Sequence, residues 1–358
     1  MLAPNPVPTT ALDWARARLF NSWLNSILTV ALLAAMLWLL PKLFSWAVTD
    51  AVFSPDPNAC RAAKGACWGF IVEKFRLMIF GTYPYAEQWR PLLTMVMLLT
   101  LIGLTMNLNL WGRTLWIGWL VSVPAMWVLM RGGMFGLVPV GTERWGGLPL
   151  TLILSVNGIV LSFPLALLLA LGRRSDLPAI KAICVGFIEL VRGVPLITVL
   201  FMATLMIPLF LPQGFTIDQL LRAQIAFILF AAAYEAEVVR GGLQAMPRGQ
   251  FEAADALGLS YWQKMGKIVL PQAITIVIPP IVNTFIGLFK DTSLVSIVSL
   301  TDLLLATKDI ALADVDWRAF YAEGYAFVAL IYFVFCFFMS KYSQYLERSF
   351  ETGRRKRR

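Results

Sequence analysis

Long apolar segments constrain this chain more than any other feature of its sequence. A run of about 20 apolar residues is long enough to cross a bilayer as a helix. We expect eight such segments, near 26–48, 92–110, 114–131, 150–171, 190–211, 223–240, 273–290 and 324–342. Because 59% of the 358 residues are hydrophobic and only 14% are charged, the sequence predicts an all-α integral membrane protein with about eight transmembrane helices.

The amino terminus lacks the pattern of a cleavable signal peptide. Its first twenty residues are rich in proline and then polar, with Asp13, Arg16 and Arg18, whereas a signal peptide places a short apolar region there. We therefore expect the first apolar segment to remain in the protein as a membrane anchor.

The distribution of charge indicates a topology. The net charge of +9 is concentrated near 173–174, in the 240–267 loop and in the tail at 354–358, and basic loops of membrane proteins remain cytoplasmic. Eight spans then place the loop at 49–90 outside, together with the acidic segment between the last two spans. The basic balance is thus explained by the membrane, including contact with anionic lipid, and does not indicate nucleic acid.

Cysteine and histidine usage adds two constraints. Cys60 and Cys67 lie in the external loop, where an oxidising compartment favours a disulfide, although two free thiols remain the alternative. The chain has no histidine, and no group of side chains with catalytic or metal-binding spacing stands out. We also find no phosphate-binding Gly-x-x-x-x-Gly-Lys-Ser/Thr motif. The sequence therefore favours a protein that is not an enzyme and holds no metal.

A polar insert interrupts the apolar segments at 248–271, with the sequence RGQFEAADALGLSYWQKMGKIVLP. Pro247 precedes a short alanine-rich helix, and Gly258 is suited to end it because glycine adopts the left-handed conformation easily. Ser260 and Gln263 have the spacing of a capping box for a second helix. The insert therefore predicts two helices joined by a glycine turn.

This insert resembles the EAA loop of the membrane subunits of bacterial ABC importers. The matching positions are Glu252, Ala253, Ala254, Gly258, Ile268, Leu270 and Pro271. The segments 150–175, 187–201, 234–250 and 270–298 look like the polar amino acid branch of type I ABC import permeases. Three additional amino-terminal spans and a loop with two cysteines make the chain similar to one subunit of the general L-amino acid importers of Gram-negative bacteria. The alternative for the insert is an ordinary amphipathic loop.

The resemblance implies a domain organisation and a set of partners. It implies a five-helix permease core at 150–345, after an extension at 1–149 with a periplasmic loop at 49–90, and before a basic cytoplasmic tail at 346–358. Both termini would lie in the cytoplasm, with the chain in the bacterial inner membrane. The partners would be a homologous second permease subunit, a dimer of cytoplasmic ABC ATPases, a periplasmic amino-acid-binding protein and membrane lipid. ATP and Mg would bind to the ATPases, and this chain would carry no cofactor.

Polar residues inside apolar segments are expensive and therefore candidates for a transport pathway. The main group is Asn283, Lys290, Asp291, Thr292 and Ser293. Lys290 and Asp291 would meet the carboxylate and the ammonium group of a zwitterion, on a helix that Pro279 and Pro280 break. The alternatives are that the two side chains pair with each other or that the lysine reaches the membrane interface.

Further ionisable residues occur near helix ends. Glu189 and Arg192 are three residues apart, as are Glu237 and Arg240, a spacing at which helical side chains meet. We interpret both pairs as structural salt bridges or gate contacts. Glu235 lies deeper in its span, where it would bind an ammonium group or pair with a lysine of another helix. Pro195 is expected to start a new helix after a kink.

These observations favour a permease subunit that imports polar L-amino acids by alternating access, coupled through the 249–271 loop to a separate ATPase. One alternative is a channel or receptor subunit that works without an ATPase. Another is an importer restricted to opines or to a single amino acid, since no motif reads the side chain of the substrate.

Overall fold

The computed structural model describes residues 10–355, and the chain divides into two compact units, 1–73 and 74–358. The two units are defined by their internal contacts, so they do not test the expected division into 1–149 and 150–345. That division stays a prediction. Lys356, Arg357 and Arg358 of the expected basic tail lie outside the described residues.

The first unit consists of short helices and one long apolar helix. Its helices are α1 (Ala11–Arg18), α2 (Trp23–Phe44) with a π-helical turn at Ser45–Thr49, and α3 (Pro57–Ala62), and α4 (Gly69–Phe80) begins in it. Ser22 caps α2 by accepting a hydrogen bond from the backbone N–H of Asn25. No residue of α2 is buried. A helix that is apolar on all sides and unburied is suited to lipid surroundings.

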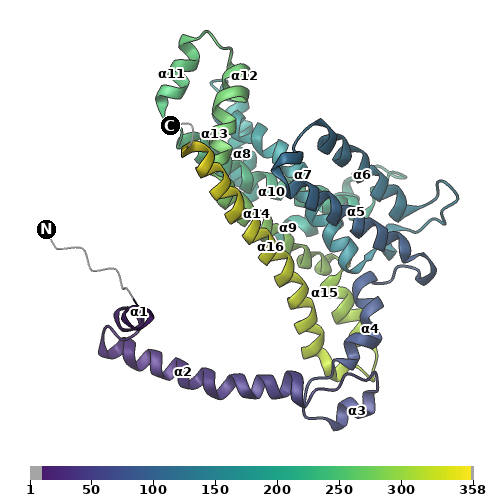
Figure 1. Ribbon diagram of the computed structural model, residues 1–358. Helices are drawn as coiled ribbons and strands as arrows, with labels where there is room; N and C mark the ends of the chain where they lie inside the picture. Colours follow the sequence, from purple (N-terminus) through teal and green to yellow (C-terminus); the bar gives the residue numbers. More distant parts are fainter. Residues whose placement is uncertain (1–9, 356–358) are drawn as a thin grey trace. The chain divides into compact units, whose positions relative to one another are not determined.

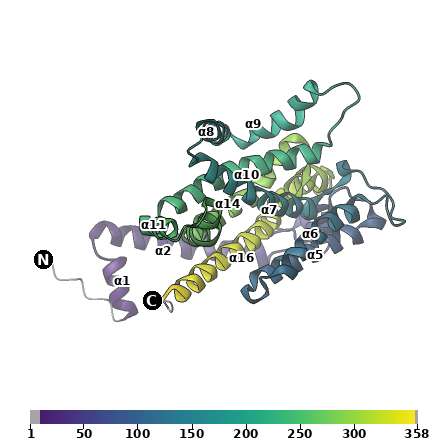
Figure 2. The ribbon, with the colours of Figure 1, turned by 90° about the horizontal axis from the view of Figure 1, so that it is seen from above.

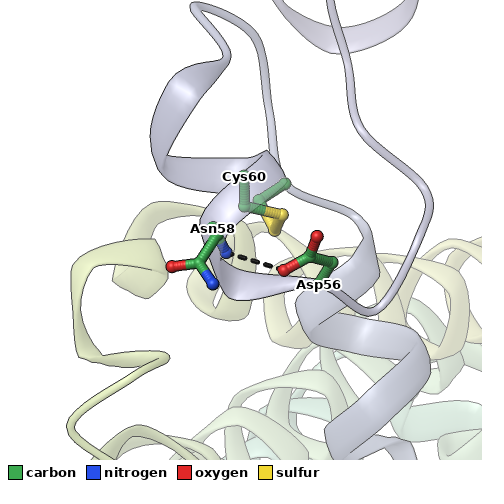
Figure 3. The surroundings of a disulfide bond; sticks show 4 residues. Asp56, Asn58 and Cys60 are labelled. Carbon is green, nitrogen blue, oxygen red and sulfur yellow. Dashed lines mark hydrogen bonds between the residues drawn. A yellow bond between two sulfur atoms is a disulfide. The ribbon is translucent and has the colours of Figure 1, made fainter.

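A disulfide between Cys60 and Cys67 closes a small loop after α2 (Figure 3). The two Cα atoms are 5.4 Å apart, and Asp56 caps α3 by accepting a hydrogen bond from the backbone N–H of Asn58 at 2.9 Å. Gly65 lets the loop fold closely on itself, because a Cβ there would lie 2.1 Å from the carbonyl oxygen of Asp50. The two cysteines of the 49–90 loop are thus paired in the structure.

The second unit is a helical bundle with one minimal strand. Its helices are α5 (Trp89–Met106), α6 (Arg113–Arg131), α7 (Gly147–Arg173), α8 (Pro178–Arg192), α9 (Leu196–Phe201), α10 (Gln219–Gln244), α11 (Arg248–Ala256), α12 (Tyr261–Lys264), α13 (Leu270–Ile276), α14 (Ile278–Asp291), α15 (Leu303–Leu305) and α16 (Tyr321–Arg355), with β1 at Thr301–Asp302. α7 and α10 pack along each other at the centre. Seen from above, α8 and α9 lie on the far side of α10, and α5 and α6 on the far side of α7 (Figure 2).

Six helical segments among the described residues are long and apolar enough to cross a membrane. They are Trp23–Thr49, Tyr85–Met106, Arg113–Arg131, Gly147–Arg173, Ile278–Val298 and Arg318–Ser349. A bent pair, Pro178–Arg192 with Leu196–Phe210, makes a seventh if it is one span. The expected span 223–240 lies within α10, which has 26 residues but carries three charged side chains in that range and does not meet the same criterion. The helix count therefore agrees roughly with the sequence.

Two helix breaks fall where prolines occur in the sequence. α8 and α9 are bent by 106° at residues 193–195, so the expected kink before Pro195 is confirmed, and the span expected at 190–211 begins at Leu196. α13 and α14 are separated at Val277, two residues before Pro279 and Pro280. Proline at the first turn of a helix removes no intrahelical hydrogen bond, so the prolines begin α14 instead of interrupting it.

Arg90 on α5 is fully buried, although nothing in the sequence marked it. Its guanidinium donates hydrogen bonds to the carbonyl oxygens of Leu129 at 2.6 Å, Val138 at 2.7 Å and Met130 at 3.1 Å. The last carbonyls of a helix lack intrahelical partners, and Arg90 satisfies them at the end of α6. It thereby joins α5, α6 and the loop that follows them.

Candidate functional site

The polar insert folds as two helices joined by a turn, as the sequence predicted. α11 ends before Gly258, which has φ +68°, and the hydroxyl of Ser260 and the side chain of Gln263 form the expected capping box at the start of α12. Lys264 on α12 pairs with Asp255 on α11 at 2.5 Å. We call residues 248–271 the coupling segment. Its two helices are therefore fixed to each other by an ion pair as well as by the turn.

The coupling segment presents small and apolar groups to its surroundings. Glu252 and Ala253 are exposed, whereas Ala254 is fully buried. Leu257 at the turn is 75% exposed and Trp262 is 68% exposed. Pro271 is exposed and Leu270 half-buried at the start of α13. Large apolar side chains at an exposed loop tip are unusual for a surface that faces only water, and they suit contact with another protein.

The coupling segment lies at one end of the second unit. Figure 1 shows α11 and α12 at the end where α16 finishes, with α15 at the opposite end. The chain then runs from α13 through Val277 into α14, which ends at Asp291. Leu270 and Pro271 of the coupling segment therefore lie at the start of α13, and the candidate pathway residues lie on or just after α14, the next helix along the chain. The structure does not bring them together.

The candidate pathway residues lie at different depths around the end of α14. Asn283 and Lys290 are exposed on the surface of the chain, and Asp291 and Ser293 are half-buried. Thr292 is fully buried and begins a 3₁₀ helix at Thr292–Val298. Among the residues that the structure describes, Lys290 and Asp291 form no ion pair.

Thr292 belongs to a buried polar group that the sequence analysis missed. The hydroxyl of Tyr332 on α16 lies 3.4 Å from the Thr292 hydroxyl and 3.4 Å from Oδ2 of Asp302. The carboxylate of Asp302, fully buried, caps α15 by accepting hydrogen bonds from the N–H groups of Leu304 and Leu305. This group holds the segment after α14 against α16. The sequence signal for this group was Asp302 followed by three leucines, because an aspartate directly before helix-forming residues is typical of a helix N-cap.

Glu235 on α10 is fully buried and faces α7. Its Oε1 accepts a hydrogen bond from the hydroxyl of Ser162 at 2.9 Å, and its Oε2 has no hydrogen-bond partner among the described residues. The lysine partner considered for Glu235 is therefore not found within the described chain. Its place between the two central helices separates it from the group at the end of α14.

An ionic cluster joins α7, α8 and α10. Glu237 pairs with Arg240 at 2.8 Å, as expected, but the expected pair of Glu189 with Arg192 is not formed. Glu189 pairs instead with Arg173 at 2.9 Å, and Arg192 lies 3.6 Å from Glu237. The three-residue spacing was a poor guide here because Arg173, at the end of α7, offers both glutamates a partner on a neighbouring helix. Within the part of the chain described, no three potential metal ligands cluster.

A family comparison decides the class of this protein. Residues 162–352 match the binding-protein-dependent transport system inner membrane component, which is more than half of the chain. The chain belongs to this family. All candidate coupling, pathway and ionic-cluster residues fall inside the matched range, whereas Cys60 and Cys67 precede it. The assignment to ABC import permeases is therefore confirmed.

Curated relatives extend the similarity over the whole chain. The chain is 49% identical to the inner membrane amino-acid ABC transporter permease protein YhdY of Escherichia coli, over 96% of this chain and 94% of that protein. It is 39% identical to the glutamate/glutamine/aspartate/asparagine transport system permease protein BztC of Rhodobacter capsulatus, over 99% of this chain and 98% of that protein.

A solved structure supports the fold of the family's core. The crystal structure of an amino acid ABC transporter with histidines is 33% identical, with a TM-score of 0.51. It covers 57% of this chain and 92% of that chain. The all-α type I permease fold expected from the sequence is therefore confirmed.

Proposed function

We propose that this chain is a permease subunit of an ATP-driven importer that carries polar L-amino acids across the bacterial inner membrane. Two relatives that match nearly its whole length are an amino-acid ABC transporter permease and a permease of a transport system for glutamate, glutamine, aspartate and asparagine. This similarity supports the substrate class. An importer restricted to opines or to one amino acid is the narrower alternative. Lys290 and Asp291 would contact the two charges that all such substrates share.

The observation that carries the proposal is the geometry of the coupling segment. Its exposed residues include Glu252, Ala253, Leu257 and Trp262. The side-chain amide of Gln272 on α13 donates a hydrogen bond to Oε1 of Gln250 on α11 at 3.1 Å. A partner that pushes on α11 would therefore move α13 and, beyond Val277, α14. We propose that ATPase closure is transmitted along this path to the residues at the end of α14.

The partners follow from the same proposal. A dimer of cytoplasmic ABC ATPases would bind the coupling segment and would hold ATP and Mg. A homologous second permease would face this chain in the membrane, and a periplasmic binding protein would deliver the amino acid. Both termini would be cytoplasmic, with a core at 150–345 and an extension at 1–149, both in contact with membrane lipid.

The experiment is a purification of the chain from its native membrane, comparing wild type with Glu252→Lys. We expect the wild type to retain an ATPase and a second permease, and the variant to lose the ATPase because a lysine reverses the charge on the exposed face. Glu143→Lys is the control, since Glu143 is exposed at Thr142–Arg144, away from the coupling segment. Reconstituted wild-type complex should show ATP hydrolysis stimulated by amino acids together with the binding protein.

The opposite result would favour a different class of protein. A wild-type chain that purifies alone and conducts or binds amino acids without nucleotide would be a channel or receptor subunit. If wild type and Glu252→Lys retain the ATPase equally, the importer function would stand, but the role of Glu252 in ATPase binding would be wrong.

A further inference from the structure

A tight turn in the loop after α6 holds a phenylalanine in an unfavourable backbone conformation. The backbone N–H of Leu137 donates a hydrogen bond to the carbonyl oxygen of Met134 at 3.0 Å and closes the turn. Its two central residues, Phe135 and Gly136, have φ values of +53° and +77°. Asparagine and glycine adopt this conformation readily, whereas a bulky side chain at positive φ is uncommon. Phe135 therefore strains the backbone at this position.

The side chains of this turn give no reason for the strain within the described chain. Phe135 is 87% exposed, and Met134 and Val138 are 54% and 57% exposed. The sequence at 132–140, GGMFGLVPV, contains no polar or charged side chain. We call residues 134–138 the apolar tip. Backbone strain and exposed apolar groups that occur together indicate a contact with another molecule.

The base of the apolar tip is fixed to α5 and α6. The buried guanidinium of Arg90 donates hydrogen bonds to the carbonyl oxygens of Val138 at 2.7 Å and Met130 at 3.1 Å. The backbone N–H of Val140 donates to the carbonyl oxygen of Arg131 at 2.7 Å. A force that acts on the tip is therefore transmitted to both helices.

The ends of α6 indicate where the apolar tip lies relative to the membrane. α6 begins at Arg113 and ends at Arg131, both exposed, with no charged residue between them. Its 19 residues give a length of about 28 Å, close to the hydrocarbon thickness of about 30 Å. Arginines at the two ends of a span extend toward the headgroups. Because the apolar tip follows Arg131 directly, it starts at the membrane interface.

We propose that the apolar tip inserts into the membrane and anchors the ends of α5 and α6 in lipid. Protein interfaces usually surround an apolar centre with polar groups, and residues 132–140 offer none, so lipid is favoured over a protein partner. Arg131, exposed at the base of the tip, suits contact with a lipid phosphate. The side of the membrane rests on the proposed function, because cytoplasmic termini place the loop after α6 in the outer leaflet.

The test measures contact between the tip and lipid by fluorescence quenching, using the full chain in phospholipid nanodiscs. Cys184→Ser and Cys336→Ser remove the two free thiols, and Met134→Cys then supplies one site for an environment-sensitive dye. We expect phospholipid with a nitroxide on its acyl chain to quench this dye, and iodide in the water to leave it bright. Glu143→Cys in the same background is the matched control, because Glu143 is exposed in the polar part of the same loop. Iodide should quench a dye there, and the nitroxide lipid should not.

Phe135→Asn separates lipid contact from a structural role of the side chain. Asparagine tolerates positive φ, so the thermal midpoint of this variant in detergent should equal or exceed that of the wild type. The dye at Met134→Cys should nevertheless lose its quenching by nitroxide lipid and become accessible to iodide. Phe135→Leu keeps an apolar side chain and should retain the lipid quenching. A lower midpoint for Phe135→Asn with unchanged lipid quenching would overturn the proposal.

Two further outcomes would also contradict the lipid anchor. A dye at Met134→Cys that iodide quenches and nitroxide lipid does not would place the tip in water. Protection of that dye from iodide only after addition of the binding protein or the second permease would make its partner a protein. The titration contains neither nucleotide nor amino acid, so its result does not depend on transport. A reconstituted complex that imports no amino acid would refute the proposed function and leave the lipid contact standing.

Discussion

Nη1 of Arg173 on α7 lies 2.6 Å from Oε1 of Glu237 on α10. The same guanidinium group pairs with Glu189 on α8 at 2.9 Å, so one arginine connects three helices. Glu237 is only 14% exposed and has Arg173, Arg192 and Arg240 around it. The ionic cluster therefore depends on Glu237 more than on any other of its members.

Replacing Glu237 with glutamine should lower the stability of the bundle. The variant leaves three arginines around a neutral side chain, and we expect a loss of about 2 kcal/mol, between the values for exposed and buried ion pairs. Glu189→Gln is the matched control, because Glu189 is 56% exposed and should contribute less than about 1 kcal/mol. Thermal unfolding of both variants in detergent measures the difference. Equal shifts of the unfolding midpoint would contradict the central role of Glu237.

Gly258→Ala should weaken the binding of the ATPase to the coupling segment by straining the backbone of the turn. Gly258 has φ +68° and a Cβ there would meet no atom within 4 Å, so the variant introduces strain without a clash. The cost for an alanine in this conformation is about 1–2 kcal/mol. We expect less ATPase to co-purify with the variant.

Gly249→Ala is the matched control for Gly258→Ala. Gly249 lies within α11, where a Cβ also meets no atom within 4 Å, and alanine stabilises a helix by about 1 kcal/mol relative to glycine. This variant should retain the ATPase at or above the wild-type amount. A similar loss in both variants would indicate that any side chain on the segment interferes with the partner, and that the turn has no special role.

The ion pair of Lys74 with Asp314 should make stability depend on pH. A hydrogen bond from Lys74 at 2.7 Å, together with one from the backbone N–H of Asp316, lowers the pKa of the Asp314 carboxyl below its ordinary value of 3.8. Because the folded-state pKa is depressed, the pair stabilises the protein above pH 3.8, and this contribution is lost as the pH falls through the folded-state pKa.

Asp314→Asn tests this dependence. The thermal midpoint of the variant should lie below that of the wild type by a constant amount between pH 7 and pH 5. The difference should shrink as the pH falls from 3.8 through the folded-state pKa, below which the wild-type carboxyl is also neutral. A difference that persists at the lowest pH would mean that Asp314 acts through its shape or its backbone contacts and not through its charge.

Mass spectrometry after alkylation tests the disulfide, because only free cysteines are alkylated. Cys60 and Cys67 are paired, whereas Cys184 and Cys336 are free. Alkylation of the unfolded, unreduced protein should therefore add two groups, and alkylation after reduction should add four. Closing a loop of eight residues restricts the unfolded chain by about 2.5 kcal/mol in the chain-entropy model, so Cys60→Ser should make the loop easier to cleave by protease. Four groups added without reduction would contradict the pairing.

Local sequence rules predicted the coupling segment well because its structure depends on neighbours in the chain. Gly258, Ser260 and Gln263 act within a few residues of one another, and the structure forms the turn and the capping box that their spacing predicts. The long apolar helices could also be predicted from the sequence, because a membrane-spanning helix requires a certain length and an apolar composition.

The same local rules could not predict contacts between segments that are distant in the sequence. The sequence paired Glu189 with Arg192, but Arg173 comes from α7 and competes for the same carboxylate. Arg90 was overlooked for a similar reason, since its partners are carbonyl oxygens at the end of another helix. Side chains that satisfy backbone groups elsewhere leave no local pattern.

The hydrogen bond from Ser162 on α7 to Glu235 on α10 gives a final prediction about the two central helices. Its length is 2.9 Å, and both residues are fully buried. Ser162→Ala removes the hydroxyl that donates a hydrogen bond to Oε1 of Glu235. Oε2 of Glu235 already lacks a hydrogen-bond partner among the described residues. Leaving a buried acceptor without a donor costs about 1–3 kcal/mol. Thermal unfolding in detergent should therefore show a clear loss of stability for this variant.

Ser155→Ala is the matched control, because Ser155 is also buried on α7 but donates only to the carbonyl oxygen of Leu152 in its own helix. Its loss should be smaller than that of Ser162→Ala. Adding Glu235→Ala to Ser162→Ala separates the hydrogen bond from side-chain packing, since the second substitution removes the acceptor that the first leaves without a donor. If the two substitutions are additive, the hydrogen bond contributes nothing to the packing of α7 on α10. If Ser162→Ala costs less in the absence of Glu235, the difference measures the hydrogen bond.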